Sequence, residues 1–182
     1  MSNMHWLLEI DKNLFYDIHV RLHSTILDPL ALLVTHLGRG EVQAAFLIFF
    51  ACWKHLRKYA LAGGIAGLFS GAVRIVMAHL VGRVRPSNFS FSHPLESVYS
   101  NTSFPSGHTT TSFAIAVIVL ILTWGQKSAW VGWLLILLAG LIGMSRIYVG
   151  VHFPGYVLGG AVLGSLCAGA TYLFMRKKYF SS

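Results

Sequence analysis

Long apolar runs separated by short polar clusters make up most of this chain. Three runs are long enough to cross a bilayer core, which takes about 20 apolar residues. They cover residues 60–81, 109–124 with its flanks, and 129–144. A fourth run over 157–175 is apolar and rich in glycine. The pattern predicts a membrane-spanning helix over each of the four.

Two shorter apolar runs, 26–37 and 42–53, come earlier and are separated by Gly38-Arg39-Gly40-Glu41. Each is marginal as a span, so we expect a helical hairpin of two short spans. Residues 4–22 mix apolar and charged positions at near-helical spacing, which is typical of a helix lying in the membrane interface. The sequence therefore predicts an all-α, polytopic membrane bundle of about six transmembrane helices. Its expected parts are an interfacial amphipathic helix over 1–22 and a membrane domain over 23–178.

Composition agrees with a membrane protein of one domain. The 182 residues are 55% hydrophobic and only 11% charged, with a mean hydropathy of +0.63. Charged residues from Glu9 to Arg21 stand where a signal peptide would have its apolar segment, so we expect no cleavable signal. The net charge of +8 is scattered over segment ends, with no basic stripe or aromatic platform. We therefore expect the bilayer, and no nucleic acid, as a partner.

The basic residues predict how the chain is oriented. Lys54, Arg57 and Lys58 follow the second run, Lys127 lies between the fourth and fifth, and residues 176–178 close the last. With six spans, all of these fall on one side, which the positive-inside rule makes cytoplasmic together with both termini. The 39–41 turn, the 86–104 loop and the 145–154 connection then share the opposite side. For a bacterial cytoplasmic membrane, that side is periplasmic or extracellular.

Three polar clusters on that opposite side carry the candidate chemistry. They are Arg85-Pro86, then Pro105-Ser106-Gly107-His108, then Ser145-Arg146 with His152 six residues after the arginine. Arginine and histidine are costly near a bilayer, so their presence there marks a functional site. Arginines bind phosphate oxygens, and a Ser-Gly pair at a helix start leaves N–H groups free for an anion. These residues are suited to holding and transferring a phosphoryl group. As alternatives, they could be a helix cap and arginines that contact lipid headgroups.

In these motifs the chain resembles the type 2 phosphatidic acid phosphatase superfamily of membrane lipid phosphatases. That family's pattern is KxxxxxxRP, then PSGH, then SRxxxxxHxxxD. The second element is complete here, the third matches through Ser145, Arg146 and His152, and the first keeps Arg85 and Pro86. The resemblance covers roughly residues 24–175.

The resemblance implies a mechanism without a metal or another cofactor. His152 would attack phosphorus and form a phosphohistidine, and His108 would protonate the departing oxygen and then activate water. The phosphate oxygens would be bound by Arg85, Arg146, Ser106 and the Gly107 N–H. A lipid phosphate is the implied substrate.

Two positions depart from the family pattern. The motif lysine falls on Ala78, and either Arg74 or Arg83 could supply the lost cation. The motif aspartate, which would orient the His152 ring, falls on Tyr156. Tyr156 itself, Glu41 or Glu96 could take over that task, or a backbone carbonyl could.

The short chain, the amphipathic start and the missing lysine favour undecaprenyl pyrophosphate or a related polyprenyl carrier as the substrate. Phosphatidylglycerophosphate, phosphatidic acid and lipid A phosphates remain alternatives, as does phosphoryl transfer to an acceptor other than water. Two further alternatives have other functions. One is a non-catalytic relative that binds lipid phosphates. The other is a metal site built from four histidines: His79, His93, His108 and His152.

Overall fold

The computed structural model describes residues 5–97 and 103–179, and within these ranges all regular structure is helical. The α-helices are α1 (His5–Tyr16), α2 (Leu27–Leu37), α3 (Gly40–Ala51), α4 (Arg57–Val81), α5 (Gly107–Thr123), α6 (Ala129–Tyr148) and α7 (Pro154–Tyr179). A π-helical turn, η2 (Asp17–Arg21), continues α1, and a 3-10 turn, η3 (Pro86–Asn88), follows α4. The predicted all-α class is confirmed.

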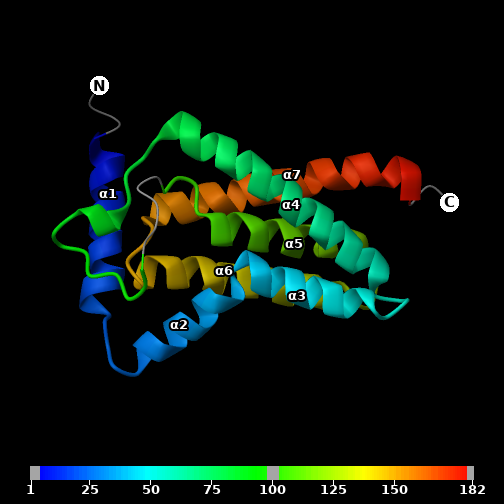
Figure 1. Cartoon of the computed structure of the whole chain (residues 1–182), viewed down its shortest axis with the longest axis horizontal. Coiled ribbons are helices and arrows are strands. Elements are labelled where there is room, and N and C mark those ends of the chain that lie inside the picture. The colour runs from blue at the N-terminus through cyan, green and yellow to red at the C-terminus, as the bar shows by residue number, and fades with distance from the viewer. Residues whose placement is uncertain (1–4, 98–102, 180–182) are drawn as a thin grey trace.

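Helix α5 is the centre of the bundle, and α4, α6 and α7 pack around it (Figure 1). Glycines let these helices approach closely. A Cβ on Gly132 of α6 would lie 2.5 Å from the Leu120 Cα, and one on Gly164 of α7 would collide with the Thr110 carbonyl oxygen. Large apolar side chains cover the outside of the bundle and are exposed there, for example Leu68, Leu137 and Leu166. Such a surface fits lipid rather than water, and the protein is an integral membrane protein.

The six apolar helices differ in length. Three are long and apolar enough to cross a membrane by themselves, namely Arg57–Val81, Ala129–Tyr148 and Pro154–Arg176. Helices α2, α3 and α5 are shorter.

The hairpin that we expected from α2 and α3 is wrong. The two helices follow one another in the same general direction (Figure 1), and they pack on different neighbours, α2 on α6 and α3 on α4. Only Gly38 and the extended Arg39 (ψ 137°) separate them. At 1.5 Å per residue, helices of 11 and 12 residues each span roughly 17 Å, about half of a bilayer core. Together they have the length of a single crossing.

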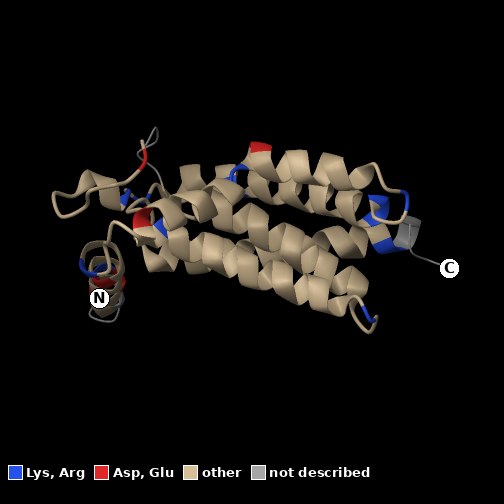
Figure 2. Ribbon diagram, turned by 90° about the horizontal axis from the view of Figure 1, so that it is seen from below, with Lys and Arg blue, Asp and Glu red and all other residues tan. Residues whose placement is uncertain are grey.

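This single crossing changes where the chain ends lie. Lys and Arg gather at the end of the bundle where α7 finishes (Figure 2), as the charge pattern predicted. However, α1 lies crosswise at the opposite end (Figure 1). The expectation that both chain ends share one face is therefore wrong. Gly38 packs against the His108 side chain, so the 39–41 turn lies beside the first turn of α5.

Helix α1 is attached to the bundle next to the α6–α7 connection. The Asp11 carboxylate accepts a hydrogen bond of 2.6 Å from the Gly155 N–H. The buried His19 ring contacts the Tyr148 carbonyl oxygen at 2.7 Å and accepts from the His93 N–H at 3.1 Å. Gly150 has a φ of +84°, and a Cβ there would lie 2.6 Å from the His19 ring. This position therefore requires glycine.

Candidate active site

The first turn of α5, the last turn of α6 and the start of α7 meet at the end of the bundle nearest α1 (Figure 1). The segment from Gly82 to Ser106 links α4 to α5 and contacts the α6–α7 connection, where Leu95 donates to the Val149 carbonyl at 3.0 Å. The three polar clusters are thus brought together although they are far apart in the sequence.

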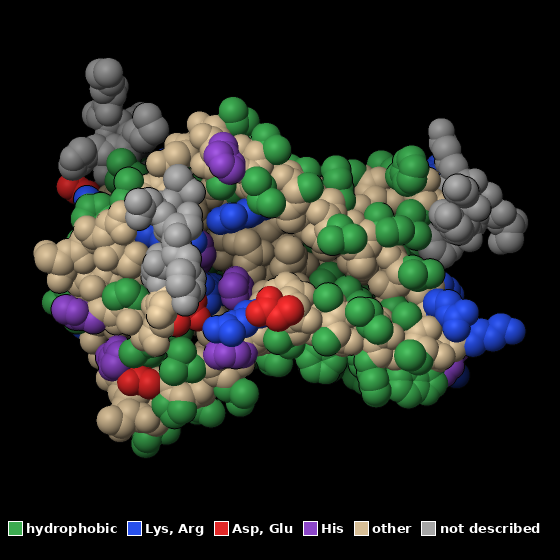
Figure 3. All heavy atoms as spheres, viewed as in Figure 1, with side chains coloured by type: hydrophobic (Ala, Val, Ile, Leu, Met, Phe, Trp, Pro, Cys, Tyr) green, Lys and Arg blue, Asp and Glu red, His purple; other side chains and the backbone are tan. Residues whose placement is uncertain are grey.

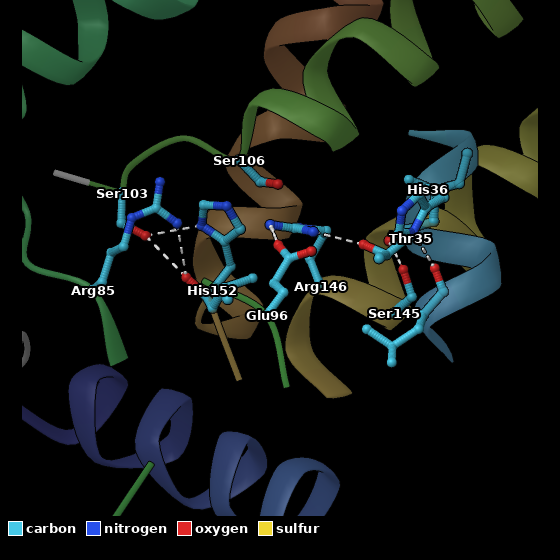
Figure 4. Close-up of polar contacts among 12 residues, drawn as sticks. Thr35, His36, Arg85, Glu96, Ser103, Ser106, Ser145, Arg146 and His152 are labelled. Atoms are coloured by element: carbon cyan, nitrogen blue, oxygen red, sulfur yellow. Dashed lines mark hydrogen bonds and ion pairs between the residues drawn. The ribbon is translucent and has the colours of Figure 1, made fainter. Parts of the chain in front are cut away.

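His152 lies in the connection between α6 and α7, and its side chain is buried, with 2% exposure. Its Nδ1 atom is 2.9 Å from the Ser103 hydroxyl oxygen. In Figure 4, Ser103 and Arg85 lie on one side of the His152 ring, and Arg146 and Glu96 lie on the other. The His152 ring is therefore held at Nδ1 by Ser103 and lies between Arg85 and Arg146.

Arg146, in the last turn of α6, is almost completely buried at 4% exposure. Its guanidinium pairs with the Glu96 carboxylate at 2.5 Å and donates to the Thr35 hydroxyl at 2.6 Å (Figure 4). Its Nε is buried and has no hydrogen-bond partner among the described residues. One donor of this cation is therefore left for a ligand.

Two further arginines reach the same region. Arg85 donates through Nη1 to the Val151 carbonyl at 3.3 Å, next to His152 (Figure 4). Arg74, from α4, donates through Nε to the Pro105 carbonyl at 3.1 Å. A Cβ on Gly107 would lie 3.5 Å from the Arg74 Nε. Arg74 therefore lies at the start of α5, where the sequence placed a phosphate-binding group.

The Pro-Ser-Gly-His motif opens α5 as expected, and Ser106 is its N-cap. The Ser106 N–H donates to the Tyr156 carbonyl at 3.0 Å. The Ser106 hydroxyl oxygen accepts from the Thr109 hydroxyl at 2.9 Å. The Ser106 hydroxyl proton remains available for a ligand. His108 follows in the first turn, and its Nε2 is buried with no hydrogen-bond partner among the described residues. An unpaired buried nitrogen next to several arginines is suited to binding an anion.

Three of the residues suggested as support for the site lie elsewhere or serve another contact. The Arg83 guanidinium lies over the Phe104 and Tyr156 rings, 5.7 and 6.0 Å from their centroids. The Tyr156 hydroxyl donates to the Val84 carbonyl at 3.0 Å, and its ring is 6.4 Å from the His152 ring. Glu41 is exposed in the first turn of α3. Glu96 does lie in the site, but it is paired with Arg146.

Arg39 is a further cation of the site, and it lies outside the three polar clusters that the sequence singles out. It is the N-cap of α3, directly after the Gly38 that packs on His108, and its charge acts on both His108 and Arg146. The signal for it was present in the sequence. Two apolar runs of half-bilayer length form one crossing, and an arginine between them lies where it is costly unless it faces a polar site.

The clustered cations determine the charge of His152. Burial and the positive charges of Arg146 and Arg85 lower the pKa of His152 well below 6.5, so its ring is neutral at physiological pH. Burial and the neighbouring Arg146 and Arg74 lower the pKa of Arg85 to about 10, which still leaves it protonated. A neutral imidazole among protonated arginines suits nucleophilic attack on an anionic phosphate.

The surroundings of the site have two other features. Figure 3 shows the surface hollowed between α4 and α3, with basic, histidine and acidic side chains around the hollow and hydrophobic ones beyond it. A separate pocket of about 200 Å³ lies under α1 and is lined by Asp11, Lys12, Arg83 and apolar residues.

Within the described residues, no three His, Cys, Asp or Glu side chains are grouped as metal ligands. The four-histidine metal site therefore has no support in this geometry.

Taken together, the bundle and the site define a membrane-embedded phosphatase with a histidine pair in an arginine-rich cluster. Residues 56–180 match the PAP2 superfamily, and the chain belongs to that family. It is an enzyme, a lipid phosphatase of the PAP2 type.

Curated relatives and solved structures agree with this assignment. The chain is 30% identical to undecaprenyl-diphosphatase BcrC of Bacillus subtilis, over 92% of this chain and 83% of that protein. It resembles the crystal structure of Aquifex aeolicus LpxE with a TM-score of 0.78 and 29% identity, covering 90% of this chain and 95% of the other. It also resembles a PAP2-type phosphatidylglycerolphosphate phosphatase from Bacillus subtilis, with a TM-score of 0.71, 25% identity and coverage of 99% and 90%.

Proposed function

We propose that the protein hydrolyses a polyprenyl pyrophosphate, undecaprenyl pyrophosphate being the best candidate, through a phosphohistidine at His152. The observation that carries this proposal is the charge of the site. Arg39, Arg74, Arg85 and Arg146 act together on His108, and among the described residues Glu96 is the carboxylate paired within this cluster. This excess of positive charge matches a pyrophosphate better than a phosphate monoester. The similarity to an undecaprenyl-diphosphatase supports the same substrate.

In the proposed first step, the neutral His152 ring attacks the terminal phosphorus through Nε2. The P–Nε2 bond forms as the bond to the bridging oxygen breaks, so the lipid monophosphate leaves with that oxygen. His108, which must be protonated for this step and gains its proton when the negatively charged substrate binds beside it, gives that proton to the leaving oxygen. Arg85, Arg146, the Ser106 hydroxyl and the Gly107 N–H bind the equatorial oxygens, where negative charge develops.

In the second step, His108 accepts a proton from water as the water oxygen attacks the phosphohistidine. The P–Nε2 bond then breaks, inorganic phosphate leaves, and both histidines return to their starting states. Arg85 keeps its proton throughout, because its pKa stays at about 10.

We also propose that the site faces the outer side of a bacterial cytoplasmic membrane. Support comes from the basic residues at the other end of the bundle, since such clusters favour the cytoplasmic side (Figure 2). In a background with Cys52 and Cys167 replaced by serine, a cysteine at Ser90 should react with an impermeant thiol reagent in intact cells. A cysteine at Ser128 should not react. The opposite labelling pattern would contradict this orientation.

Phosphate release from a panel of lipids in detergent tests the substrate. Undecaprenyl pyrophosphate should give the highest kcat/KM, ahead of phosphatidylglycerophosphate, phosphatidic acid and lipid A phosphates. Arg39→Gln should reduce kcat/KM for the pyrophosphate about tenfold or more and affect monoesters less. Arg83→Gln is the matched control, because Arg83 lies over aromatic rings outside the cluster.

Three results would count against the proposal. A preference for a monoester would favour one of the alternative lipid phosphatases. An equal loss of kcat/KM in Arg39→Gln and Arg83→Gln would show that Arg39 does not belong to the site. No release from any lipid would favour a non-catalytic relative that binds lipid phosphates.

A further inference from the structure

The residue that orients the nucleophile is not where the family pattern places it. Position 156 holds a tyrosine, whose hydroxyl donates to the Val84 carbonyl at 3.0 Å and not to His152. Glu96 is occupied by Arg146, and Glu41 is exposed on α3. The His152 Nδ1 atom instead lies 2.9 Å from the Ser103 hydroxyl oxygen (Figure 4).

The Ser103 hydroxyl has two neighbours that can accept its single proton, the Val151 carbonyl and Nδ1 of His152. The Ser103 hydroxyl is also 3.4 Å from the Val151 carbonyl oxygen, which can only accept. The hydroxyl has one proton. If that proton goes to the Val151 carbonyl, then Ser103 accepts from a protonated Nδ1 of His152. Nε2 is then unprotonated and carries the lone pair that attacks phosphorus.

The Ser103 side chain is held firmly enough for this task. It is fully buried, and its own N–H donates to the Arg83 carbonyl at 3.0 Å. The next residue, Phe104, packs edge-on against the Tyr156 ring with centroids 5.6 Å apart. Ser103 and Phe104 are therefore both held by contacts with other segments, as a positioning group requires.

We propose that Ser103 is the positioning residue for His152 and takes the place of the family's aspartate. This inference rests on the proposed role of His152 as the nucleophile. A hydroxyl holds the ring in place, but unlike a carboxylate it can donate as well as accept, so the tautomer depends on the Val151 carbonyl taking the Ser103 proton. The hydroxyl also brings no charge to stabilise the phosphohistidine cation. Ser103 acts through His152 and is not itself a catalytic residue.

The test compares Ser103→Ala with Ser92→Ala. Ser92 is a good control, since it is buried in the same connecting segment and donates to the Gly150 carbonyl at 3.1 Å without touching His152. Ser103→Ala should lower kcat about 10- to 100-fold and leave KM nearly unchanged, because the arginines still bind the phosphate. This loss is smaller than the roughly 10⁴-fold cost of a wrong tautomer in a serine protease, since the neutral ring can still sample the reactive tautomer. Ser92→Ala should stay within about twofold of the natural protein.

Two additional readouts separate positioning from a general structural effect. The ¹⁵N chemical shifts of the His152 ring should report protonation at Nδ1 in the natural protein and a mixture of tautomers in Ser103→Ala. Adding Tyr156→Asp to Ser103→Ala should recover part of the lost kcat, because it places a carboxylate at the family's position.

The outcomes distinguish this inference from the proposed function. If the natural protein releases phosphate and the Ser103→Ala and Ser92→Ala variants behave alike in rate and in ring shifts, the role of Ser103 is overturned while the proposed function stands. If Ser103→Ala lowers kcat but the His152 shifts do not change, the positioning role is also overturned. If the natural protein hydrolyses no lipid phosphate at all, the proposed function itself fails.

Discussion

Glu96→Gln should destabilise the protein measurably, because it removes the counter-ion of a buried arginine. The Arg146 side chain is 5% exposed and the Glu96 side chain is 17% exposed. Removing one partner of a fully buried ion pair costs about 3–5 kcal/mol. Glutamine keeps a hydrogen-bond acceptor, and Glu96 is partly exposed, so we expect a smaller cost of about 2 kcal/mol. For a chain of this size, that lowers the Tm by about 4–8 °C.

The measurement is thermal unfolding in detergent, with Glu41→Gln as the control. Glu41 is exposed and should contribute no more than about 0.5 kcal/mol through the dipole of α3. Vanadate, a phosphate mimic, should bind Glu96→Gln more tightly than it binds the natural protein, since it supplies the missing negative charge, and its Kd follows from the rise in Tm with vanadate concentration. Equal melting temperatures for the two glutamate variants, or vanadate that binds Glu96→Gln no more tightly than the natural protein, would show that Glu96 is not the counter-ion that Arg146 needs.

Three further results follow from the structure. Gly150→Ala should lower the free energy of unfolding by about 1–3 kcal/mol, because the backbone has a φ of +84° and the new methyl group would meet the His19 ring. The Tm of the variant measures this loss, and an unchanged Tm would contradict it. Arg85→Gln removes a cation that lowers the pKa of His152, so the acid limb of its kcat/KM profile should move to higher pH, whereas an unmoved limb would argue against His152 as the titrating group. Hydrolysis should persist in excess EDTA, and activity that is lost and then restored by a divalent ion would mean that a metal takes part.

Much of the fold could be predicted from the sequence, because membrane helices leave a strong signal. The apolar run over 60–81 became α4, which spans Arg57–Val81, and the run over 129–144 became α6, which spans Ala129–Tyr148. What failed was the pairing of the two short runs. Hydropathy shows that α2 and α3 are apolar, but each is too short to cross alone, and a two-residue break can equally be a hairpin turn or an interruption within one crossing.

For the candidate site, the residues that come together could be predicted from the sequence, but the contacts that hold them could not. The motifs predicted that Arg85, Ser106, His108, Arg146 and His152 would come together, and they do. The contacts that organise them could not be predicted. Ser103 meets a histidine 49 positions away, and no periodic pattern marks a contact made by a connecting loop. Arg83 lies only two residues before Arg85, yet its cation lies over the Phe104 ring.

Rapid quenching would show directly whether His152 carries the phosphoryl group during turnover. The enzyme would be mixed with undecaprenyl pyrophosphate labelled at the terminal phosphate, denatured within milliseconds under alkaline conditions, and digested. We predict an acid-labile label on the peptide that contains His152. His152→Ala should give no label and no turnover, although the arginines still bind the lipid. Turnover in the natural protein without any labelled His152, or near-normal turnover in His152→Ala, would contradict the account.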